Sequence, residues 1–344
     1  MRSDGKRPVT LADVAAAAGV SISAVSMALA DHPRIGVATK ENVRVLAKEL
    51  GYVTNSAARA LRSQRSATIA LIVPNTGQHV FNHPYFMQLL LGVSEISNCH
   101  DISLLVSTNS DDRHGVAAYE RVLRSRAADG AIVASAAVDD TNIARLAEFG
   151  LPVVLIGHYD GDLDAISVED VEGARLATEH LIAHGRQTIA HISGPLNHQT
   201  SLDRLEGFRL ALAQAGRPVA QAPVAAGDFD EVMGSRAAKA LLDEHPTIDG
   251  IFAANDEMAY GALVEIKRRG LRVPEDVALI GYDDFGVSRL TTPALTTVSV
   301  PAAEVGRRAT LRLLEVIEKR TPFRREVLPV SLTIRASCGC SPHS

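Results

Sequence analysis

Between residues 10 and 50, apolar positions recur every three or four residues, which is the period of an α-helix. Thr10 can cap the N-terminus of a helix, and Asp13 then lies in the first turn, where the helix dipole favours negative charge. Gly19 ends this helix, and Ser21 caps a second one only two residues later. Two short helices joined by so tight a turn predict a helix-turn-helix. The apolar face of the first helix consists of Leu11, Val14, Ala15 and Ala18.

The second helix is predicted to have one buried and one open face. Val25 and Leu29 lie four residues apart, so both are expected to contact the first helix. The outer face is left to Ile22, Ser23, Ser26 and Met27. A third helix is expected from about Val37 to Leu50, and Gly51 ends it. It closes a small three-helix core with Val43, Ala47 and Leu50.

Beyond residue 66 the pattern changes to short aliphatic runs that alternate with helical segments. This alternation is typical of parallel sheets covered by helices, and the length favours two doubly wound subdomains. The predicted strands are Ile69–Val73, Ile102–Ser107, Gly130–Ala134, Val153–Ile156, Ile189–Ile192, Ile251–Ala253 and Val277–Ile280.

The residues directly after these strands are the candidates for a ligand site, because ligands of such folds bind at the carboxyl ends of the strands. They are mostly small, polar or acidic, and no G-x-G-x-x-G follows a strand, so a neutral polyhydroxylated ligand is favoured over a phosphate. These candidates are Pro74, Asn75, Gly157, His158, Ser193, Gly194, Asn255, Asp256, Asp283 and Asp284.

Composition places the chain among ordinary folded proteins, with 344 residues, 46% hydrophobic and 22% charged. No apolar run approaches the roughly 20 residues of a membrane helix, and the first residues do not resemble a signal peptide, so we expect a cytoplasmic protein without a membrane partner. The three cysteines, Cys99, Cys338 and Cys340, fit neither a disulfide framework nor a four-ligand zinc site. They are interpreted as free thiols, and neither a metal nor a cofactor is expected.

Charge is distributed unevenly between the two ends of the chain. Residues 1–65 contain 10 Lys and Arg against 5 Asp and Glu, whereas the remainder contains 25 against 35. A basic segment on an acidic body indicates a nucleic-acid-binding head, although a solvated basic tail would have the same composition.

Three segments of the head resemble the lac repressor family: Val9-Thr-Leu-Ala-Asp-Val-Ala-Ala-Ala-Ala-Gly-Val-Ser21, Ala24-Val-Ser26 and Leu50-Gly-Tyr-Val-Thr-Asn55. The resemblance implies an operator-binding helix-turn-helix. Contacts near phosphates are implied for Thr10, Ser21, Ser26, Thr39, Tyr52 and Asn55. Base contacts are implied for Ile22, Ser23, Met27 and Arg34, which occupy base-contacting positions of the family. Leu11 is also expected to contact DNA.

The head departs from the family pattern at Met27, where many members have Arg, at Ala24, where Thr is usual, and at Gly36, where Ser caps the third helix. Thr54 also replaces a proline. Met27 and Ile22 can make only apolar contacts, for instance to thymine methyl groups, whereas an arginine would bind guanine. Operator preference is therefore expected to differ from that of many relatives.

Residues 55–62 favour a helix by composition but span only two turns, too short to be stable alone in water. By resemblance this is the hinge helix, which forms on operator DNA and inserts Leu61 into the minor groove, with Arg59 beside it. A plain linker helix with Leu61 packed on the body is the alternative. Residues 63–66 are expected to connect flexibly, so the expected regions are 1–53, 54–66 and 67–344.

The resemblance continues through the body, in motifs that include Arg204-Leu-Glu-Gly-Phe208, Ala254-Asn-Asp256 and Val277-Ala-Leu-Ile-Gly-Tyr-Asp-Asp284. It implies a periplasmic-binding-protein-like fold of type I. The first subdomain is expected at about 67–165 plus part of 291–322, and the second at about 166–290 plus about 323–340.

Effector contacts are implied for Phe86, Arg204, Asn255 and Asp283, a donor and acceptor set that suits sugar hydroxyls. Each has a structural alternative. Arg204 could pair with Asp203 or Glu206 at a helix surface, and Asn255 could cap the following helix. Asp283 could cap a turn, and Phe86 could pack in the core.

These observations predict a DNA-binding transcriptional repressor that binds a near-palindromic operator as a homodimer, is controlled by a small carbohydrate and acts on the nucleoid. A transport binding protein would share the body but not the head. An enzyme using Asp283 and Asp284 is disfavoured, because adjacent carboxylates in one turn do not flank a substrate.

Overall fold

A computed structural model describes Arg7 and residues 9–29, 31–52, 65–110, 116–158, 161–319 and 322–340. The chain divides into two compact units, Met1–Ser66 and Ala67–Ser344, which are called the head and the body below. The expected hinge residues Asn55, Arg59 and Leu61 lie outside the described residues.

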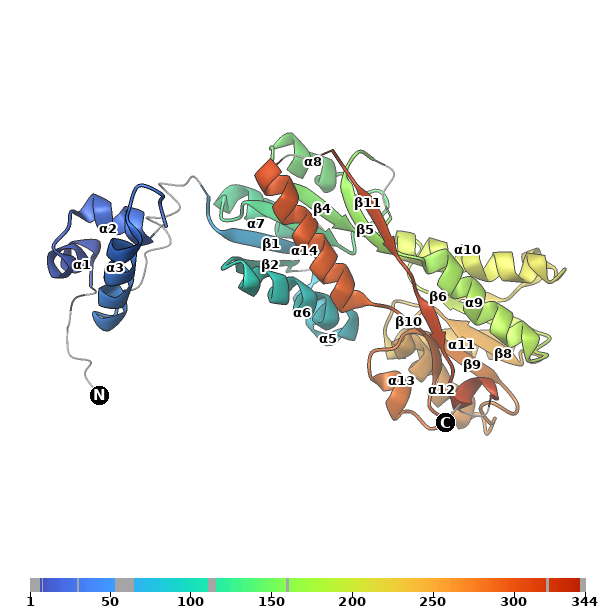
Figure 1. Ribbon diagram of the computed structural model, residues 1–344. Helices are drawn as coiled ribbons and strands as arrows, with labels where there is room; N and C mark the ends of the chain where they lie inside the picture. Colours follow the sequence, from blue (N-terminus) through green and yellow to red (C-terminus); the bar gives the residue numbers. More distant parts are fainter. Residues whose placement is uncertain are drawn as a thin grey trace. The chain divides into compact units, whose positions relative to one another are not determined.

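The head is a bundle of three short helices, α1 (Leu11–Ala18), α2 (Ile22–Leu29) and α3 (Val37–Glu49), as the sequence predicts (Figure 1). The backbone N–H and hydroxyl of Thr10 both donate to the Asp13 carboxylate at 2.8 Å, which fixes the start of α1. Gly19 ends α1 with φ 65°, and Ser21 Oγ accepts from Ala24 N to begin α2. The core of the head is formed by Val14, Ala15, Val25, Ala28, Val43 and Ala47.

Two expectations about the head are wrong. Ser26, expected on the open face of α2, is only 9% exposed. It follows Val25 by about 100° around the helix, so it lies on the flank, where a small side chain is easily covered. Leu50, expected in the core, is 40% exposed because α3 ends one residue before it.

The first body sheet has the strand order β11-β5-β4-β3-β1-β2, and all neighbouring strands are parallel. Its strands are β1 (Thr68–Thr76), β2 (Ser103–Asn109), β3 (Gly130–Ala134), β4 (Val153–Ile156), β5 (Asp164–Val168) and β11 (Arg325–Leu328). The alternation of side chains along β1 explains the layers. Ile69, Leu71 and Val73 face α6 (Pro84–Cys99) and α14 (Ala302–Lys319), whereas Ala70 and Ile72 face α7 (Ala117–Ser125) and α8 (Asn142–Glu148).

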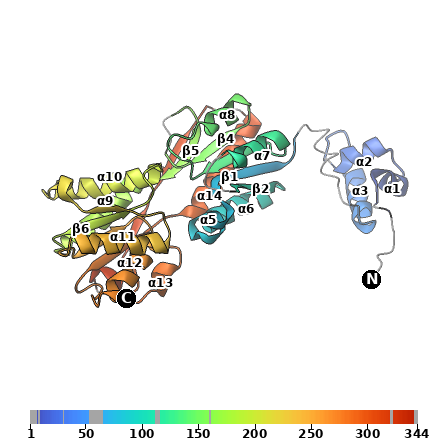
Figure 2. The same cartoon turned by 180° about the vertical axis from the view of Figure 1, so that it is seen from behind.

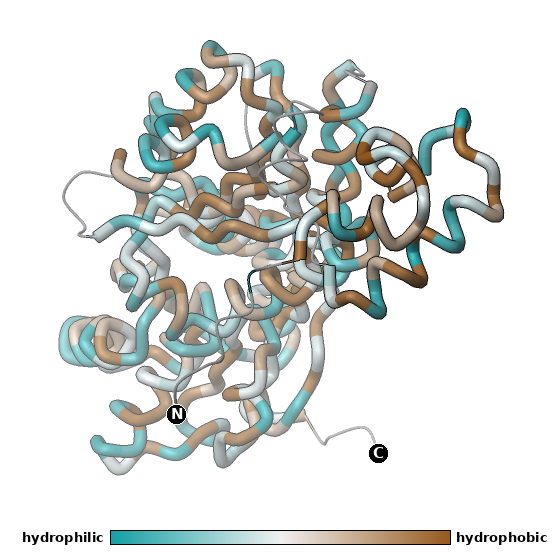
Figure 3. The backbone as a smooth tube through the Cα atoms, turned by 90° about the vertical axis from the view of Figure 1, so that its left-hand side faces the viewer, coloured by the Kyte–Doolittle hydropathy of each residue, from teal (hydrophilic) through white to brown (hydrophobic). Residues whose placement is uncertain are grey.

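The second body sheet has the strand order β12-β10-β9-β8-β6-β7, in which only β12 is antiparallel to its neighbour. Its strands are β6 (Ile189–Ser193), β7 (Val224–Ala226), β8 (Gly250–Ala253), β9 (Ala278–Asp283), β10 (Thr296–Ser299) and β12 (Ser331–Thr333). One face packs on α11 (Glu231–Glu244) and α12 (Asp256–Arg268), and the other on α9 (Asp170–Ala183) and α10 (Gln199–Gln214) (Figure 2). In Figure 3 the helices alternate apolar and polar residues, as two-faced packing requires.

The remaining elements are short: α5 (Gly77–Asn82), α13 (Val287–Leu290) and the 3-10 helices η1 (Val219–Gln221) and η2 (Ala336–Cys338). Helix α5 lies between β1 and α6, which carries Phe86. Thr76 Oγ1 accepts from His79 N and thereby caps α5.

The C-terminal chain passes between the sheets differently from the expectation. β11, assigned from sequence to the second subdomain, pairs with β5 in the first sheet, with Arg325 opposite Ala165. β5 itself extends past the expected boundary at residue 165. The reason lies in the edge of the sheet: Asp164 accepts from Arg312 Nε at 2.6 Å and from Arg324 N at 2.7 Å, which holds β11 against β5. Figure 1 shows this strand, in red, beside β5.

Among the described residues, no single helix is long and apolar enough to cross a membrane. Helices α1 and α2 together have the length and apolar composition of a membrane span, but they are bent by 99° where they meet. Its apolar side chains form the core of the head instead.

Candidate functional site

A cavity of about 360 Å³ lies in the body where residues from both sheets meet. The first sheet contributes the ends of β3, β4 and β5, and the second sheet contributes the ends of β9 and the region between β6 and α10. Of the expected effector residues, Phe86, Arg204 and Asp283 line this cavity. It therefore lies at the carboxyl ends of parallel strands, where the strand-end rule places a ligand.

Arg204 is buried in α10 with its guanidinium held on several sides. It is 5% exposed, and its Nε donates to Asp170 Oδ1 at 2.8 Å. Another nitrogen donates to the Ala254 carbonyl, and the guanidinium carbon lies 3.7 Å from the centre of the Tyr282 ring. The alternative of a surface pair with Asp203 or Glu206 is wrong. The guanidinium is instead a fixed donor on the wall of the cavity.

Asp283 faces Arg204 from the end of β9, with 3.8 Å between its Oδ1 and the Arg204 Nη2. Its backbone has φ 108°, which a non-glycine residue rarely adopts and which marks a strained position. Burial raises the pKa of the Asp283 carboxyl well above its usual range. The neighbouring Asp284 points elsewhere and accepts from Arg335 and Ser288.

Asn255 does not line the cavity, and both polar atoms of its side chain form hydrogen bonds with other protein groups. Its Oδ1 accepts from Met258 N and caps α12, which is the structural alternative raised from sequence. Its Nδ2 lies 2.8 Å from the Phe229 carbonyl and 2.9 Å from Glu257 Oε2. Asn255 therefore positions the loop of Phe229, a residue that does line the cavity.

His83 links α6 to this network. Its Nδ1 accepts from Tyr85 N at 3.3 Å, and its Nε2 lies 3.2 Å from Asn255 Nδ2 and 3.8 Å from Glu257 Oε2. Burial lowers the pKa of His83 to about 4 and raises the pKa of Glu257 to about 7. The pKa of the imidazole is thus below its usual value, whereas the pKa of the carboxyl is above it.

Aromatic rings form one wall of the cavity. The ring of Phe86 meets that of His83 edge-on at 5.7 Å between centroids, and Phe229 meets His83 at 6.5 Å. Phe86 also packs in the core of the first subdomain, so its core packing is confirmed and its contact with an effector stays a prediction. Phe229 was missed from sequence because it follows β7, a strand too short and too exposed to be predicted.

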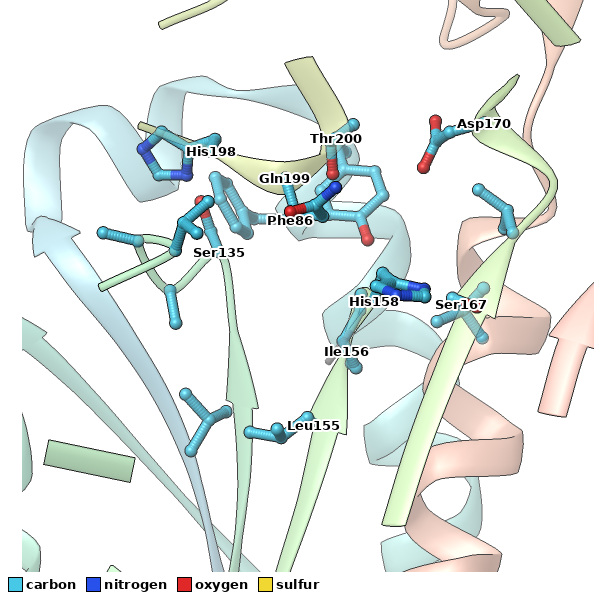
Figure 4. Close-up of a pocket in the computed structure, with 18 of the residues that line it drawn as sticks. Phe86, Ser135, Leu155, Ile156, His158, Ser167, Asp170, His198, Gln199 and Thr200 are labelled. Atoms are coloured by element: carbon cyan, nitrogen blue, oxygen red, sulfur yellow. The ribbon is translucent and has the colours of Figure 1, made fainter. Parts of the chain in front are cut away.

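Several polar residues that line the cavity were also not predicted from the sequence. Figure 4 shows His198, Gln199 and Thr200 from the start of α10, with Ser135, Ser167 and Asp170 from the other segments around the cavity. His158 was anticipated because it follows β4. Ser135 follows β3 directly, so the same rule could have found it. Asp170 and Ser167 could not be found in this way, because β5 was not recognised as a strand.

Three side chains near the cavity could approach a cation: His83, Glu257 and Asp283 have ligand atoms within 4.8 Å of one another. The guanidinium of Arg204 lies beside Asp283, however, and already supplies positive charge there. The arrangement therefore favours hydrogen bonding to an uncharged ligand over metal binding.

The head presents a second candidate surface, for DNA. Ile22 is 52% exposed, and Ser21, Ser23 and Arg34 are also exposed. Met27, Thr39 and Tyr52 are half-buried, as is Leu11, which packs against the core. Thr10 is exposed at the start of α1. The open face of α2 thus consists mainly of Ile22, Ser23 and Met27 around the capping Ser21.

Family comparisons match both units of the chain. Residues 10–55 match the bacterial regulatory proteins of the lacI family. Residues 66–336 match the family described as periplasmic binding proteins and sugar binding domain of the LacI family.

Individual proteins are similar over the same length. The HTH-type transcriptional regulator CelR of Thermobifida fusca is 36% identical over 341 residues, which cover 96% of this chain and 99% of CelR. The ribose operon repressor of Halalkalibacterium halodurans is 32% identical, covering 95% of this chain and 96% of the repressor. A crystal structure of the lac repressor dimer bound to operator and the anti-inducer ONPF superimposes with a TM-score of 0.84 at 28% identity, covering 96% of this chain and 99% of the other. A CelR–cellobiose complex superimposes with a TM-score of 0.75 at 34% identity, with the same coverage.

Proposed function

Because this chain belongs to the LacI family of DNA-binding transcriptional regulators, we propose that it is a repressor that binds a near-palindromic operator as a homodimer and that a small neutral carbohydrate controls its operator affinity. The observation that carries the effector proposal is the buried Arg204–Asp170–Asp283 group in the wall of the cavity.

Carbohydrate chemistry suits this cavity. Sugar hydroxyls both donate and accept, and the lining residues that the structure describes offer a fixed guanidinium, carboxyls, hydroxyls and imidazoles without a cluster of Lys and Arg for a phosphate. Phe86 and Phe229 provide flat apolar surfaces for the C–H face of a sugar ring. A volume of about 360 Å³ falls in the range of small-molecule sites. The relatives point the same way, since CelR has been seen with cellobiose and another family member with bound ribose.

The switch is proposed to arise because the cavity lies between the two subdomains. A ligand that contacts Phe86 on one side and Arg204 on the other stabilises one relative arrangement of the sheets over another. The ligand shifts the equilibrium by its difference in affinity for the two arrangements. The short crossovers after β5, after β10 and between β11 and β12 are where the chain would bend.

Operator recognition is assigned to the open face of α2. Ser23 and Met27 lie opposite Val25, and Ile22 and Arg34 extend the surface. Met27 and Ile22 favour apolar contacts with thymine methyl groups. Thr10, Ser21, Thr39 and Tyr52 are proposed to approach phosphates, and Leu11 to support them from the core. Ser26, being largely buried, is assigned a supporting role. Asn55, Arg59 and Leu61 are proposed for the hinge.

Two other functions fit less well. A transport binding protein has no use for the helix-turn-helix head. We propose no catalytic role, because Asp283 faces Arg204 whereas Asp284 is paired with Arg335, so the two carboxyls do not face one substrate. A DNA partner implies that the protein acts in the cytoplasm.

A thermal-shift screen of the purified protein against sugars and nucleobases tests the effector proposal, since a ligand that binds the folded state raises the melting temperature. A sugar hit must then change the affinity for an operator obtained by selection from random DNA. Stabilisation by nucleobases alone would contradict the carbohydrate proposal. Turnover of a glycoside by the protein would contradict the absence of catalysis.

A further inference from the structure

Three potential metal-binding side chains converge at the end of α9, away from the effector cavity. His180 and His184 are four residues apart, so both imidazoles lie on one face of the helix. Cys340 follows η2 near the C-terminus and brings its thiol to the same place. The three ligand atoms all lie within 4.8 Å of one another.

The distances match those between the ligands of one tetrahedral ion. Cys340 Sγ lies 3.4 Å from His180 Nε2 and 3.0 Å from His184 Nε2. With the usual Zn–S and Zn–N bond lengths, a sulfur and a nitrogen on one tetrahedral zinc are about 3.5 Å apart. Small side-chain movements would therefore admit an ion between them.

The backbone of residues 338–340 directs the Cys340 thiol toward α9. Cys338 is buried, and its Sγ accepts from Thr296 Oγ1 at 3.1 Å, which anchors η2 on β10. Gly339 follows with φ 99°, a conformation that side-chain-bearing residues rarely adopt, and turns the chain so that Cys340 points back to α9. The sequence Cys-Gly-Cys thus places one thiol in the core and presents the other to the two histidines.

A hydrogen-bonded thiol explains the cluster less completely. A thiol has one hydrogen, so Cys340 can donate to one imidazole nitrogen and accept only a weak hydrogen bond from the other, whereas a metal ion would bind all three groups as ligands. Arg186, whose guanidinium lies near Gly339, is engaged with the carbonyls of Pro274 and Glu275. The sulfur and the two imidazole nitrogens can therefore share a cation once the thiol loses its proton.

We propose that His180, His184 and Cys340 bind a soft divalent transition-metal ion such as Zn²⁺. One thiolate and two imidazoles form a ligand set that zinc prefers, and i, i+4 histidines on a helix are a recurrent metal-binding pair. The ion binds as Cys340 loses its proton to solvent, and it ties the C-terminal segment to α9 in the second subdomain. This proposal replaces the expectation of free thiols and no metal, which considered the cysteines without the distant histidines.

The test uses the full-length protein after treatment with a chelator and a thiol reductant. Addition of Zn²⁺ is expected to saturate at one ion per chain and to raise the melting temperature by about 5 °C at an excess of about one hundredfold over the dissociation constant. Co²⁺ in place of Zn²⁺ is expected to show the thiolate-to-cobalt charge-transfer band of a cysteine ligand. Cys340→Ser should abolish this band, and His184→Gln should weaken binding at least tenfold.

Cys99→Ser is the matched control, because Cys99 is exposed on α6 and takes no part in the cluster. It should leave the band and the stoichiometry unchanged. Wild-type binding that is absent, or that persists unchanged in Cys340→Ser or His184→Gln, would overturn the proposal.

A second measurement uses the wild-type protein and so does not depend on whether a variant folds. Zn²⁺ should slow alkylation of Cys340 by iodoacetamide, followed by mass spectrometry, while Cys99 in the same sample reacts at an unchanged rate. Equal alkylation of Cys340 with and without Zn²⁺ would overturn the proposal.

Discussion

Arg204 Nε donates to Asp170 Oδ1 at 2.8 Å, and this pair joins the start of α9 to α10 in the wall of the body cavity. Both side chains are nearly buried, so the ion pair is well shielded from solvent. The pair fixes the plane of the guanidinium before any ligand arrives. A fixed donor binds more tightly than a mobile one, because less side-chain freedom is lost on binding.

Arg204→Ala is expected to leave operator affinity intact and to abolish or severely weaken the response to effector. Loss of a charged donor from a buried ligand contact costs on the order of 2 to 5 kcal/mol, roughly 30-fold or more in affinity. Fluorescence anisotropy of labelled operator, with and without the identified effector, measures both properties. Normal effector response at wild-type concentrations would show that Arg204 does not contact the ligand.

The control for this experiment is Arg209→Ala, which removes an exposed arginine from the same helix. It should change neither property. Because Arg204→Ala also leaves Asp170 without its partner, circular dichroism melts must show that the variant is folded at the assay temperature.

Glu257→Gln is expected to change how stability depends on pH. Burial raises the pKa of Glu257 to about 7 from the usual 4.5, so between these values the folded state holds more protons than the unfolded state. The free energy of unfolding of the wild type therefore falls as pH rises through this window, by roughly 3 kcal/mol from this group. The variant lacks this loss and should be more stable than the wild type above pH 7.

Glu265 on the same helix provides the opposite case. Hydrogen bonds from Arg268 and Arg269 lower its pKa to about 2, so its charged form is favoured in the folded state. Its contribution is present above pH 4.5 and is lost as pH falls through about 2. Glu265→Gln should therefore lower the melting temperature at pH 7. Thermal melts of both variants over the same pH series measure these effects. If both variants changed the melting temperature in the same direction above pH 7, the opposite pKa shifts of Glu257 and Glu265 would be contradicted.

Leu61→Ala is expected to weaken specific operator binding far more than binding to random DNA. The proposed wedge contributes only when the hinge helices fold in a bent minor groove. The slope of log affinity against log salt should stay at the wild-type value, since leucine touches no phosphate. Titrations of operator and random duplexes at several salt concentrations measure this. Equal losses on both duplexes would identify Leu61 as a structural residue.

The protein is expected to bind its operator as a dimer, because one recognition helix covers only a few base pairs and a two-fold protein matches a two-fold site. Analytical ultracentrifugation of the protein with a selected operator duplex measures the stoichiometry. A stable complex of one chain with the whole operator would refute this expectation, as would a selected operator without two-fold symmetry.

The sequence determined the three helices of the head, because their signals are local. Thr10, Gly19 and Ser21 act within one turn of their own positions, and the burial of Val14, Val25 and Val43 follows from helical spacing. The central strands of the body were equally clear, since a strand covered on both faces must be apolar throughout, as β3 and β4 largely are.

Tertiary structure decided everything that depends on which distant segments meet. The edge strands β7, β11 and β12 bury too little surface to show an apolar pattern, so their positions depend on the pairing of the sheet edges. The contact of Asp170 with Arg204, and of Cys340 with His180 and His184, joins residues far apart in the chain. Periodicity reports which face of an element is buried, but only the order of strands and the crossovers between sheets determine what that face, and the polar side chains beside it, will meet.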